Sequence, residues 1–270
     1  MSLLIVTDLD GTLLEHHSYS FEPAREALKS LADRGIQPIF NSSKTAAEIE
    51  ALQSKLDLRA PYICENGAAL IREPATIASK ENRIFGARRD EWLAQIHQLR
   101  IDQKFRFEGF ADWSVKELMR VTELDSESAE LARKRQFTEP ILWLDSEAAL
   151  LDFQSCLQRL QLQLVEGGRF FSIQSSFNKA TAMHWLREQS ALEQESLIVA
   201  LGDSPNDSEM LEAADIAVIV KSAKSSHISL SSPSTIIHTD KAGPAGWQEA
   251  IHQILARFDA GEYSTNVRKS

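Results

Sequence analysis

Two carboxylates separated by one residue follow the first apolar run of the chain. Asp8 and Asp10 stand in residues 8–12, DLDGT, directly after the run 3–6, LLIV. One carboxylate of such a pair can attack phosphorus and carry an aspartyl-phosphate, while the other can protonate the leaving oxygen and then activate water. An isolated Asp-x-Asp is also typical of a turn with solvated acids. The apolar run before the pair and the Gly-Thr after it favour the catalytic interpretation.

A second polar segment combines two hydroxyls with a lysine. Ser42, Ser43 and Lys44 lie in residues 41–45, NSSKT, between a predicted strand and a predicted helix. Hydroxyls and free backbone N–H groups at a helix start form an anion site, although a simple N-cap would use the same residues. Both serines are candidates for holding a phosphoryl group. We favour Ser42, which is nearer to the strand end, and expect Ser43 and Lys44 to contact substrate.

Lys179 is the third candidate. It follows the turn-like segment 175–178, SSFN, and begins a predicted helix. An ammonium group at this point could neutralise both a nucleophilic carboxylate and the phosphoryl group being transferred. Most lysines are solvated surface residues, so Lys179 carries weight only in combination with the other segments.

The fourth candidate is the acidic loop 202–207, GDSPND, which follows a predicted strand. Mg²⁺ prefers a few carboxylates together with waters and phosphate oxygens. Asp203 would complete such a site with Asp8 and the backbone carbonyl of Asp10. Asn206 and Asp207 are expected to surround the site without binding the ion directly. An N-cap at Asp207 is the plainer interpretation of the same loop.

The elements that must position these residues alternate between strand and helix. Short apolar runs predict strands, and amphipathic segments between them predict helices, which is the pattern of an α/β fold with a parallel sheet covered on both faces. Carboxyl ends of parallel strands share one edge of the sheet, and ligands bind there. The predicted strands are 3–6, 36–40, 62–64, 197–201, 216–220 and 235–238, and the predicted helices are 21–33, 45–56, 179–189, 207–213 and 246–258.

The alternation is interrupted by a long insertion. Charged amphipathic segments and short strand candidates dominate the middle of the chain, which predicts a separate α+β domain there. The predicted division is 1–83 with 173–270 for the catalytic core and 84–172 for the inserted cap. Because the insertion lies between Ser42 and Lys179, we expect it to close over the substrate and set specificity.

Composition narrows the class of protein further. The chain has 270 residues, a net charge of −10 and 43% apolar residues. These values indicate a soluble globular protein and argue against a nucleic-acid or acidic-membrane partner. Cys64 and Cys156 do not form a disulfide framework. With no signal-like N-terminus and no long apolar stretch, we expect a cytoplasmic protein that is a monomer or a homodimer.

Taken together, the four segments resemble the motifs of the haloacid dehalogenase superfamily of phosphohydrolases. The resemblance implies a Rossmann-like parallel core with an inserted α+β cap of the C2 type. It also implies that Asp8 is the nucleophile and Asp10 the general acid and base. Ser42 and Lys179 would hold the phosphoryl group, and the acidic loop would anchor Mg²⁺.

Finer features resemble the mannosyl-3-phosphoglycerate phosphatase family. The matching segments are 41–45, 65–68, 167–170, 202–207, 217–221 and 243–247. The resemblance implies hydrolysis of mannosyl-3-phosphoglycerate, or of its glucosyl variant, to a glycosylglycerate that serves as a compatible solute. Gly168 and Arg169 would then bind substrate, with Arg169 gripping the carboxylate. The alternative for Arg169 is an ordinary surface arginine. The alternatives for the activity are another sugar phosphatase and a phosphosugar mutase.

Overall fold

The computed structural model describes residues 2–16, 18–72, 82–167, 169–193, 196–233 and 235–263. The chain forms two compact units. The first comprises Met1–Ser42, Leu58–Ile63 and Lys179–Ser270, and the second comprises Ser43–Asp57 and Cys64–Asn178.

The first unit is built on a parallel sheet. Its strands run in the order β12-β11-β10-β1-β2-β3, and each neighbouring pair is parallel. The strands are β1 (Ser2–Thr7), β2 (Ile39–Asn41), β3 (Tyr62–Cys64), β10 (Ser196–Gly202), β11 (Ile216–Lys221) and β12 (Thr235–Ala242). The central strands are buried on both faces, which explains why their sequences are unbroken apolar runs rather than alternating ones.

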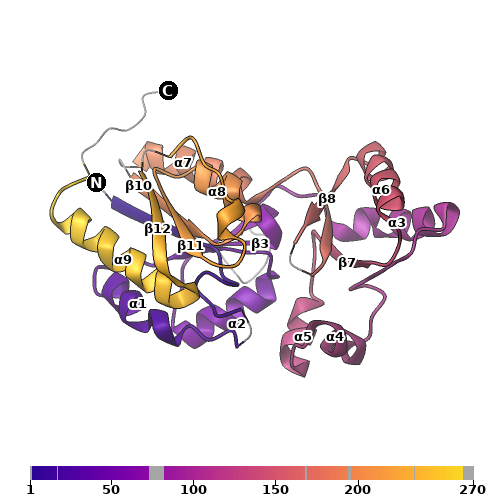
Figure 1. The fold of residues 1–270 in the computed structure, drawn as a ribbon, viewed down its shortest axis with the longest axis horizontal. Coiled ribbons are helices and arrows are strands. Elements are labelled where there is room, and N and C mark those ends of the chain that lie inside the picture. The colour runs from indigo at the N-terminus through magenta and orange to yellow at the C-terminus, as the bar shows by residue number, and fades with distance from the viewer. Residues whose placement is uncertain are drawn as a thin grey trace. The chain divides into compact units, whose positions relative to one another are not determined.

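Helices cover both faces of this sheet (Figure 1). On one face lie α1 (Arg25–Ala32) and α9 (Gly243–Asp259), and on the other lie α7 (Lys179–Glu193) and α8 (Ser208–Glu212). Three 3₁₀ turns complete the unit: η1 (Glu22–Ala24), η3 (Pro205–Asp207) and η4 (Ser225–His227). The predicted α/β class with a parallel sheet is therefore confirmed.

The strand order reverses direction between β1 and β10. The chain builds β1, β2 and β3 outward in one direction and later returns to place β10 on the other side of β1. Thr7 pairs with Leu201 in the parallel register, and the Asp8 N–H donates to Leu201 O at 2.9 Å. In an open α/β sheet this switch point is where ligands bind, beyond the carboxyl ends of the strands.

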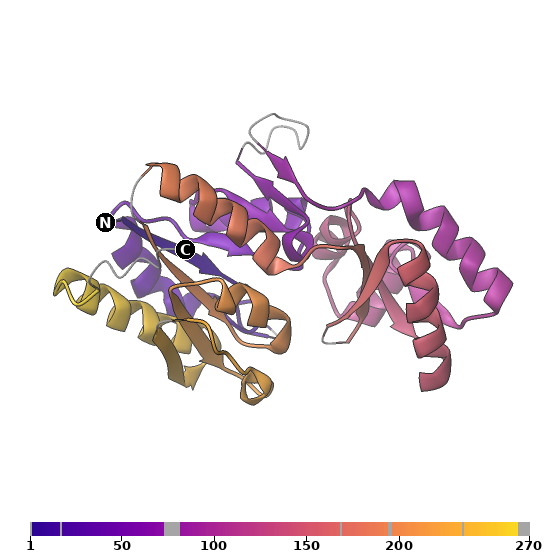
Figure 2. The ribbon, with the colours of Figure 1, turned by 90° about the horizontal axis from the view of Figure 1, so that it is seen from above.

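The second unit contains an antiparallel sheet of four strands, in the order β6-β7-β9-β8. The strands are β6 (Phe107–Gly109), β7 (Glu139–Trp143), β8 (Leu162–Glu166) and β9 (Phe171–Ser175). Helices α3 (Arg89–Gln103) and α6 (Glu147–Arg159) pack on it around Trp92, Phe107 and Phe153. Figure 2 gives a second view of this α+β part, seen from above.

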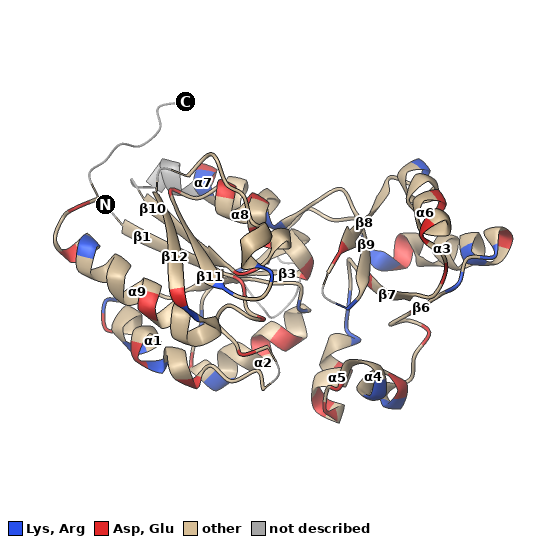
Figure 3. Ribbon diagram, in the orientation of Figure 1, with Lys and Arg blue, Asp and Glu red and all other residues tan. Residues whose placement is uncertain are grey.

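Two further helices form a smaller cluster of their own. These are α4 (Val115–Thr122) and α5 (Ser126–Ala132), which pack around Phe110, Trp113 and Leu118. Acidic and basic residues are both present along α3, α4 and α6, as Figure 3 shows. Among the described helices, none combines the length and apolarity needed to cross a membrane.

The second unit extends beyond the predicted cap. It includes α2 (Ala46–Leu56), η2 (Glu65–Gly67) and the antiparallel pair β4 (Ala69–Ile71) and β5 (Arg83–Ile84). Thr45 Oγ1 donates to Leu131 O at 3.0 Å. The buried Glu65 carboxylate accepts the N–H groups of residues 136, 137 and 138. These polar contacts explain why the compact units do not coincide with the predicted bounds 1–83 with 173–270 and 84–172.

The aromatic core of the second unit offers a test of its packing. Phe153 is fully buried, with its ring centroid 5.2 Å from those of Phe105 and Phe107. Phe153→Ala should lower the free energy of unfolding of this unit by about 3–5 kcal/mol, because it opens a cavity. Leu151→Ala in the same helix, where the side chain is 60% exposed, should change it by about 0.5 kcal/mol or less. Urea unfolding followed by circular dichroism measures both, and equal effects would contradict the packing described.

Candidate active site

A buried ammonium group joins two loops at the switch point of the parallel sheet. Lys179, the first residue of α7, is 2% exposed. Its Nζ donates to Asp8 Oδ1 at 2.5 Å and to Asp207 Oδ1 at 2.6 Å. Burial by itself would lower the pKa of Lys179, but the carboxylates of Asp207 and Asp8 outweigh burial and raise that pKa above its usual value. Lys179 is therefore charged throughout the physiological pH range.

A third carboxylate brings an excess of negative charge to the same place. Asp8, Asp203 and Asp207 each offer an oxygen, and these oxygens lie within 4.8 Å of one another. The Thr12 hydroxyl lies 3.4 Å from Asp8 Oδ2 and 3.2 Å from Asp203 Oδ1. A hydroxyl has one proton, so it can satisfy only one of these acceptors at a time.

Burial shifts the ionisation of the carboxyl groups in this cluster. It raises the pKa of Asp8 well above its usual value, and the charge of Lys179 opposes that rise. Burial, followed by the nearby carboxylate of Asp207, raises the pKa of Asp203 from 3.8 to about 6. Like charges held together away from water disfavour their own ionisation, and a cation would relieve this cost.

The residues of this cluster fit a divalent cation. Asp207 uses one oxygen for Lys179 and the other for the N–H groups of Asp203 and Ser204, both at 3.1 Å. Its carboxylate is thereby committed to shaping the loop, whereas Asp8 and Asp203 keep lone pairs available for an ion. Gly11 has a φ of +86°, and a Cβ there would lie 2.7 Å from Asp203 Oδ2. Glycine at position 11 therefore makes room for the Asp203 carboxylate beside the turn.

The structure thus brings four of the predicted site residues together: Asp8, Lys179, Asp203 and Asp207. Two others belong to the same unit. Asp10 is half-buried in the turn after β1, and Ser42 is 1% exposed, with its N–H donating to Ile63 O at 3.1 Å. Asn206 is exposed and accepts a hydrogen bond from the Ser204 hydroxyl.

The remaining predicted residues belong to the second unit. The Ser43 carbonyl accepts from Arg135 Nη1 at 3.1 Å, and the Lys44 carbonyl accepts the Glu65 N–H at 2.9 Å. Arg169 donates to the Val121 carbonyl and lies 3.4 Å from a Glu123 carboxylate oxygen. Gly168 lies outside the described residues.

Two residues of the site had no role assigned from sequence. The Thr12 hydroxyl lies within hydrogen-bond distance of two acids, as described above, and can donate to one of them at a time. Asn41 is fully buried, and its Nδ2 donates to the Lys179 backbone carbonyl at 2.9 Å, which fixes the first turn of α7. A polar residue that ends an apolar strand was the available signal for Asn41, but nothing in its spacing pointed to Lys179.

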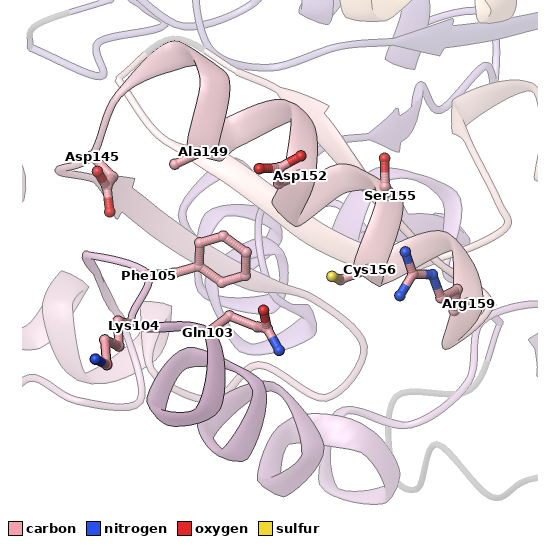
Figure 4. A pocket seen from close by; sticks show the side chains of 9 residues that line it. All are labelled: Gln103, Lys104, Phe105, Asp145, Ala149, Asp152, Ser155, Cys156 and Arg159. Atoms are coloured by element: carbon pink, nitrogen blue, oxygen red, sulfur yellow. The ribbon is translucent and has the colours of Figure 1, made fainter.

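A separate hollow of about 350 Å³ lies in the second unit, between the end of α3 and α6 (Figure 4). Phe105 and Cys156 point into it, and charges of both signs surround it. Its lining contains none of the predicted site residues. This hollow is therefore separate from the acidic cluster described above.

Comparison with known proteins shows the family of this chain. A model described as haloacid dehalogenase-like hydrolase matches residues 5–149 and 153–243. The chain belongs to the haloacid dehalogenase-like hydrolase family. A glucosyl-3-phosphoglycerate/mannosyl-3-phosphoglycerate phosphatase of Persephonella marina is similar to this hydrolase, with 34% identity over 269 residues. The match covers 96% of this chain and 99% of the relative. The hydrolase therefore acts on phosphoric monoesters.

Solved structures share its fold. A phosphatase of the haloalkanoate superfamily from Bacteroides thetaiotaomicron is 19% identical, with a TM-score of 0.65, over 94% of this chain and 95% of that one. The sucrose-phosphatase of Synechocystis, solved with sucrose and phosphate, is 15% identical, with a TM-score of 0.59, over 94% of this chain and 98% of that one. At these identities the likeness concerns the fold alone, and it supports the expected parallel core with an inserted cap.

The raised pKa of Asp203 predicts an unusual dependence of stability on pH. Folded Asp203 keeps its proton up to a pH of about 6, whereas an unfolded aspartate releases it near 3.8. The folded state therefore binds more protons between these values, so the metal-free hydrolase should lose stability as the pH rises through them. At pH 7 with a chelator, Asp203→Asn should be more stable than the wild type by about 1–3 kcal/mol.

Chemical denaturation at pH 4 and pH 7 measures this difference, which should shrink at the lower pH. Added Mg²⁺ should then stabilise the wild type and leave the variant unchanged. The exposed Asp33→Asn serves as a matched control and should follow the wild type. If the variant is less stable than the wild type without metal at pH 7, the repulsion described between the buried carboxylates is contradicted.

Proposed function

We propose that this hydrolase removes phosphate from a glycosyl-3-phosphoglycerate, either the mannosyl or the glucosyl compound, and releases a glycosylglycerate. One observation supports the proposed reaction above all, the buried contact of Lys179 with Asp8 beside the carboxylate of Asp203. The substrate class is supported by the name of the Persephonella relative and by its near full-length match.

Asp8 acts as the nucleophile in this proposal. One of its carboxylate oxygens forms a bond to phosphorus while the bond from phosphorus to the glycerate oxygen breaks. Asp10 gives its proton to that leaving oxygen. Asp10 then takes a proton from water, which attacks phosphorus, breaks the bond to Asp8 and releases inorganic phosphate. Both carboxylates return to their starting states.

The other residues of the site act on charge and position. Lys179 faces the nucleophile and can offset the negative charge of the transferring phosphoryl group. Ser42 would bind a phosphoryl oxygen through its hydroxyl. Asp8, Asp203 and the Asp10 carbonyl would hold Mg²⁺, with Asn206 and Asp207 around them. When bound, Mg²⁺ supplies positive charge that favours ionised Asp8 and screens it from the phosphate.

Specificity is assigned to the inserted cap and to the loop after Ser42. Arg169 would exchange its contacts with Val121 and Glu123 for the substrate carboxylate, which a guanidinium can bind through two hydrogen bonds. Gly168, Ser43 and Lys44 would complete the substrate contacts. We also propose that the hydrolase is a cytoplasmic monomer or homodimer whose partner is this small substrate, without a nucleic-acid or membrane partner.

Replacement of the nucleophile tests the reaction. Asp8→Asn should lower kcat by about 10³-fold or more, because an amide cannot form the phosphoaspartyl bond, while substrate binding measured by calorimetry should persist. A chelator should remove the activity of the wild type, and Mg²⁺ should restore it. Asp33→Asn is the matched control. Equal turnover by Asp8→Asn, or full activity in chelator, would contradict the mechanism.

A phosphate-release screen over phosphorylated metabolites tests the substrate. Mannosyl- or glucosyl-3-phosphoglycerate should give the highest kcat/KM, without a bisphosphate activator. A requirement for such an activator would indicate a phosphosugar mutase instead. Arg169→Ala should reduce kcat/KM for these substrates by about tenfold or more, since a charged hydrogen-bonded pair is lost, and should spare a generic aryl phosphate. If both substrates lose equally, Arg169 does not read the carboxylate.

A further inference from the structure

A chain of buried hydrogen bonds leads from the last helix to the main chain of Asp8. The indole Nε1 of Trp247, in α9, donates to Thr7 Oγ1 at 3.0 Å. The Thr7 hydroxyl in turn donates to the Asp8 carbonyl at 2.7 Å. Trp247 and Thr7 have no exposed surface, and Asp8 is 6% exposed. All three residues belong to the parallel-sheet unit.

The chemistry of the groups gives this chain one direction. An indole N–H can only donate, so the Thr7 oxygen must be its acceptor. The single proton of the Thr7 hydroxyl is then left for the Asp8 carbonyl. Because these groups are buried, breaking either bond would leave a polar group unsatisfied away from water, which is costly. These two hydrogen bonds therefore keep Trp247, Thr7 and the Asp8 carbonyl in one arrangement.

A glycine lets α9 approach closely enough to form the chain. A Cβ on Gly246 would lie 2.1 Å from the Lys241 carbonyl oxygen and 2.6 Å from Thr239 Oγ1, at the end of β12. The first turn of α9 can therefore rest against this strand end only with glycine at position 246. This close approach brings Trp247, the next residue, to the end of β1.

We propose that Trp247 is a positioning residue for the nucleophile and acts through Thr7. The Asp8 N–H is held by Leu201 O, and the Asp8 carbonyl is held by Thr7. Both peptide groups that flank Asp8 are thus fixed, and only its side-chain torsions remain to be set by Lys179 and Thr12. Small displacements of a reacting group strongly reduce the reaction rate. We therefore expect the loss of either hydrogen bond to lower kcat. This inference rests on the proposed nucleophilic role of Asp8.

Trp247→Phe tests the proposal because it keeps an aromatic ring in the core and removes the N–H donor. It also removes part of the indole ring, so a control with the same loss of volume is needed. With a generic aryl phosphate and Mg²⁺, kcat should fall about tenfold, while KM should stay within about twofold, because binding is not altered. The matched control is Trp92→Phe in the second unit. Trp92 is buried there, and its Nε1 has no hydrogen-bond partner among the residues described, so its kcat should not change.

Thr7 provides an independent test. Thr7→Val should lower kcat as Trp247→Phe does, whereas Thr7→Ser keeps the hydroxyl and should restore most of the activity. The double variant Trp247→Phe/Thr7→Val should lose no more than the larger single loss, because both changes break one chain. If Trp247→Phe does not fold, the difference in kcat between Thr7→Val and Thr7→Ser tests the proposal by itself.

Three results would overturn the inference. An active wild type with unchanged kcat in Trp247→Phe or Thr7→Val would remove the positioning role and leave the proposed function intact. Multiplying losses in the double variant would show two separate effects instead of one chain. A wild type that releases no phosphate from any substrate would instead overturn the proposed function, and the positioning role with it.

Discussion

The ion pairs of the buried Lys179 ammonium group are the interactions on which the parallel-sheet unit depends. The ammonium group lies between the carboxylates of Asp8 and Asp207, which follow two strands far apart in sequence. Without it, two acids would be buried against each other with no counter-charge, which is strongly unfavourable. The same group that makes the fold tolerable faces the proposed nucleophile. Stability and the proposed chemistry therefore share one side chain, and the third acid, Asp203, leaves an excess charge that a cation can balance.

The topology of the parallel sheet explains why these residues can meet. Strands β1 and β10 are neighbours, and the register that pairs Thr7 with Leu201 carries Asp8 and the acidic loop to the same edge. Two glycines then remove steric obstacles. A Cβ on Gly11 would strike the Asp203 carboxylate, and one on Gly202 would lie 2.5 Å from Asp207 Cβ. Close packing of acidic side chains at this edge is thus possible only because the backbone beside them carries no side chain.

The second unit has a hydrophobic core of its own, so it is a compact part of the structure and not an extended loop. Phe153, Phe107 and Trp143 pack together beneath α3 and α6. The unit also includes α2 and Glu65, whose carboxylate accepts three consecutive backbone N–H groups. The segment that carries Ser43 and Lys44 therefore belongs to the same compact unit as α3 and α6.

The sequence by itself determined the parallel α/β core, and it pointed to the acids, lysine and hydroxyls proposed for the site. Apolar runs and motif order along the chain carry that information, because strand ends share one edge in such a sheet. It missed β6, which has only three residues, and α4, although Ser114 and Glu117 form a capping box at its start. Only the tertiary structure decided that Asn41 holds the Lys179 backbone, that Trp247 reaches Thr7 and that α2 belongs to the second unit. Each depends on side chains distant in sequence meeting at hydrogen-bond distance, which follows from strand register and helix approach and leaves no periodic trace in the sequence.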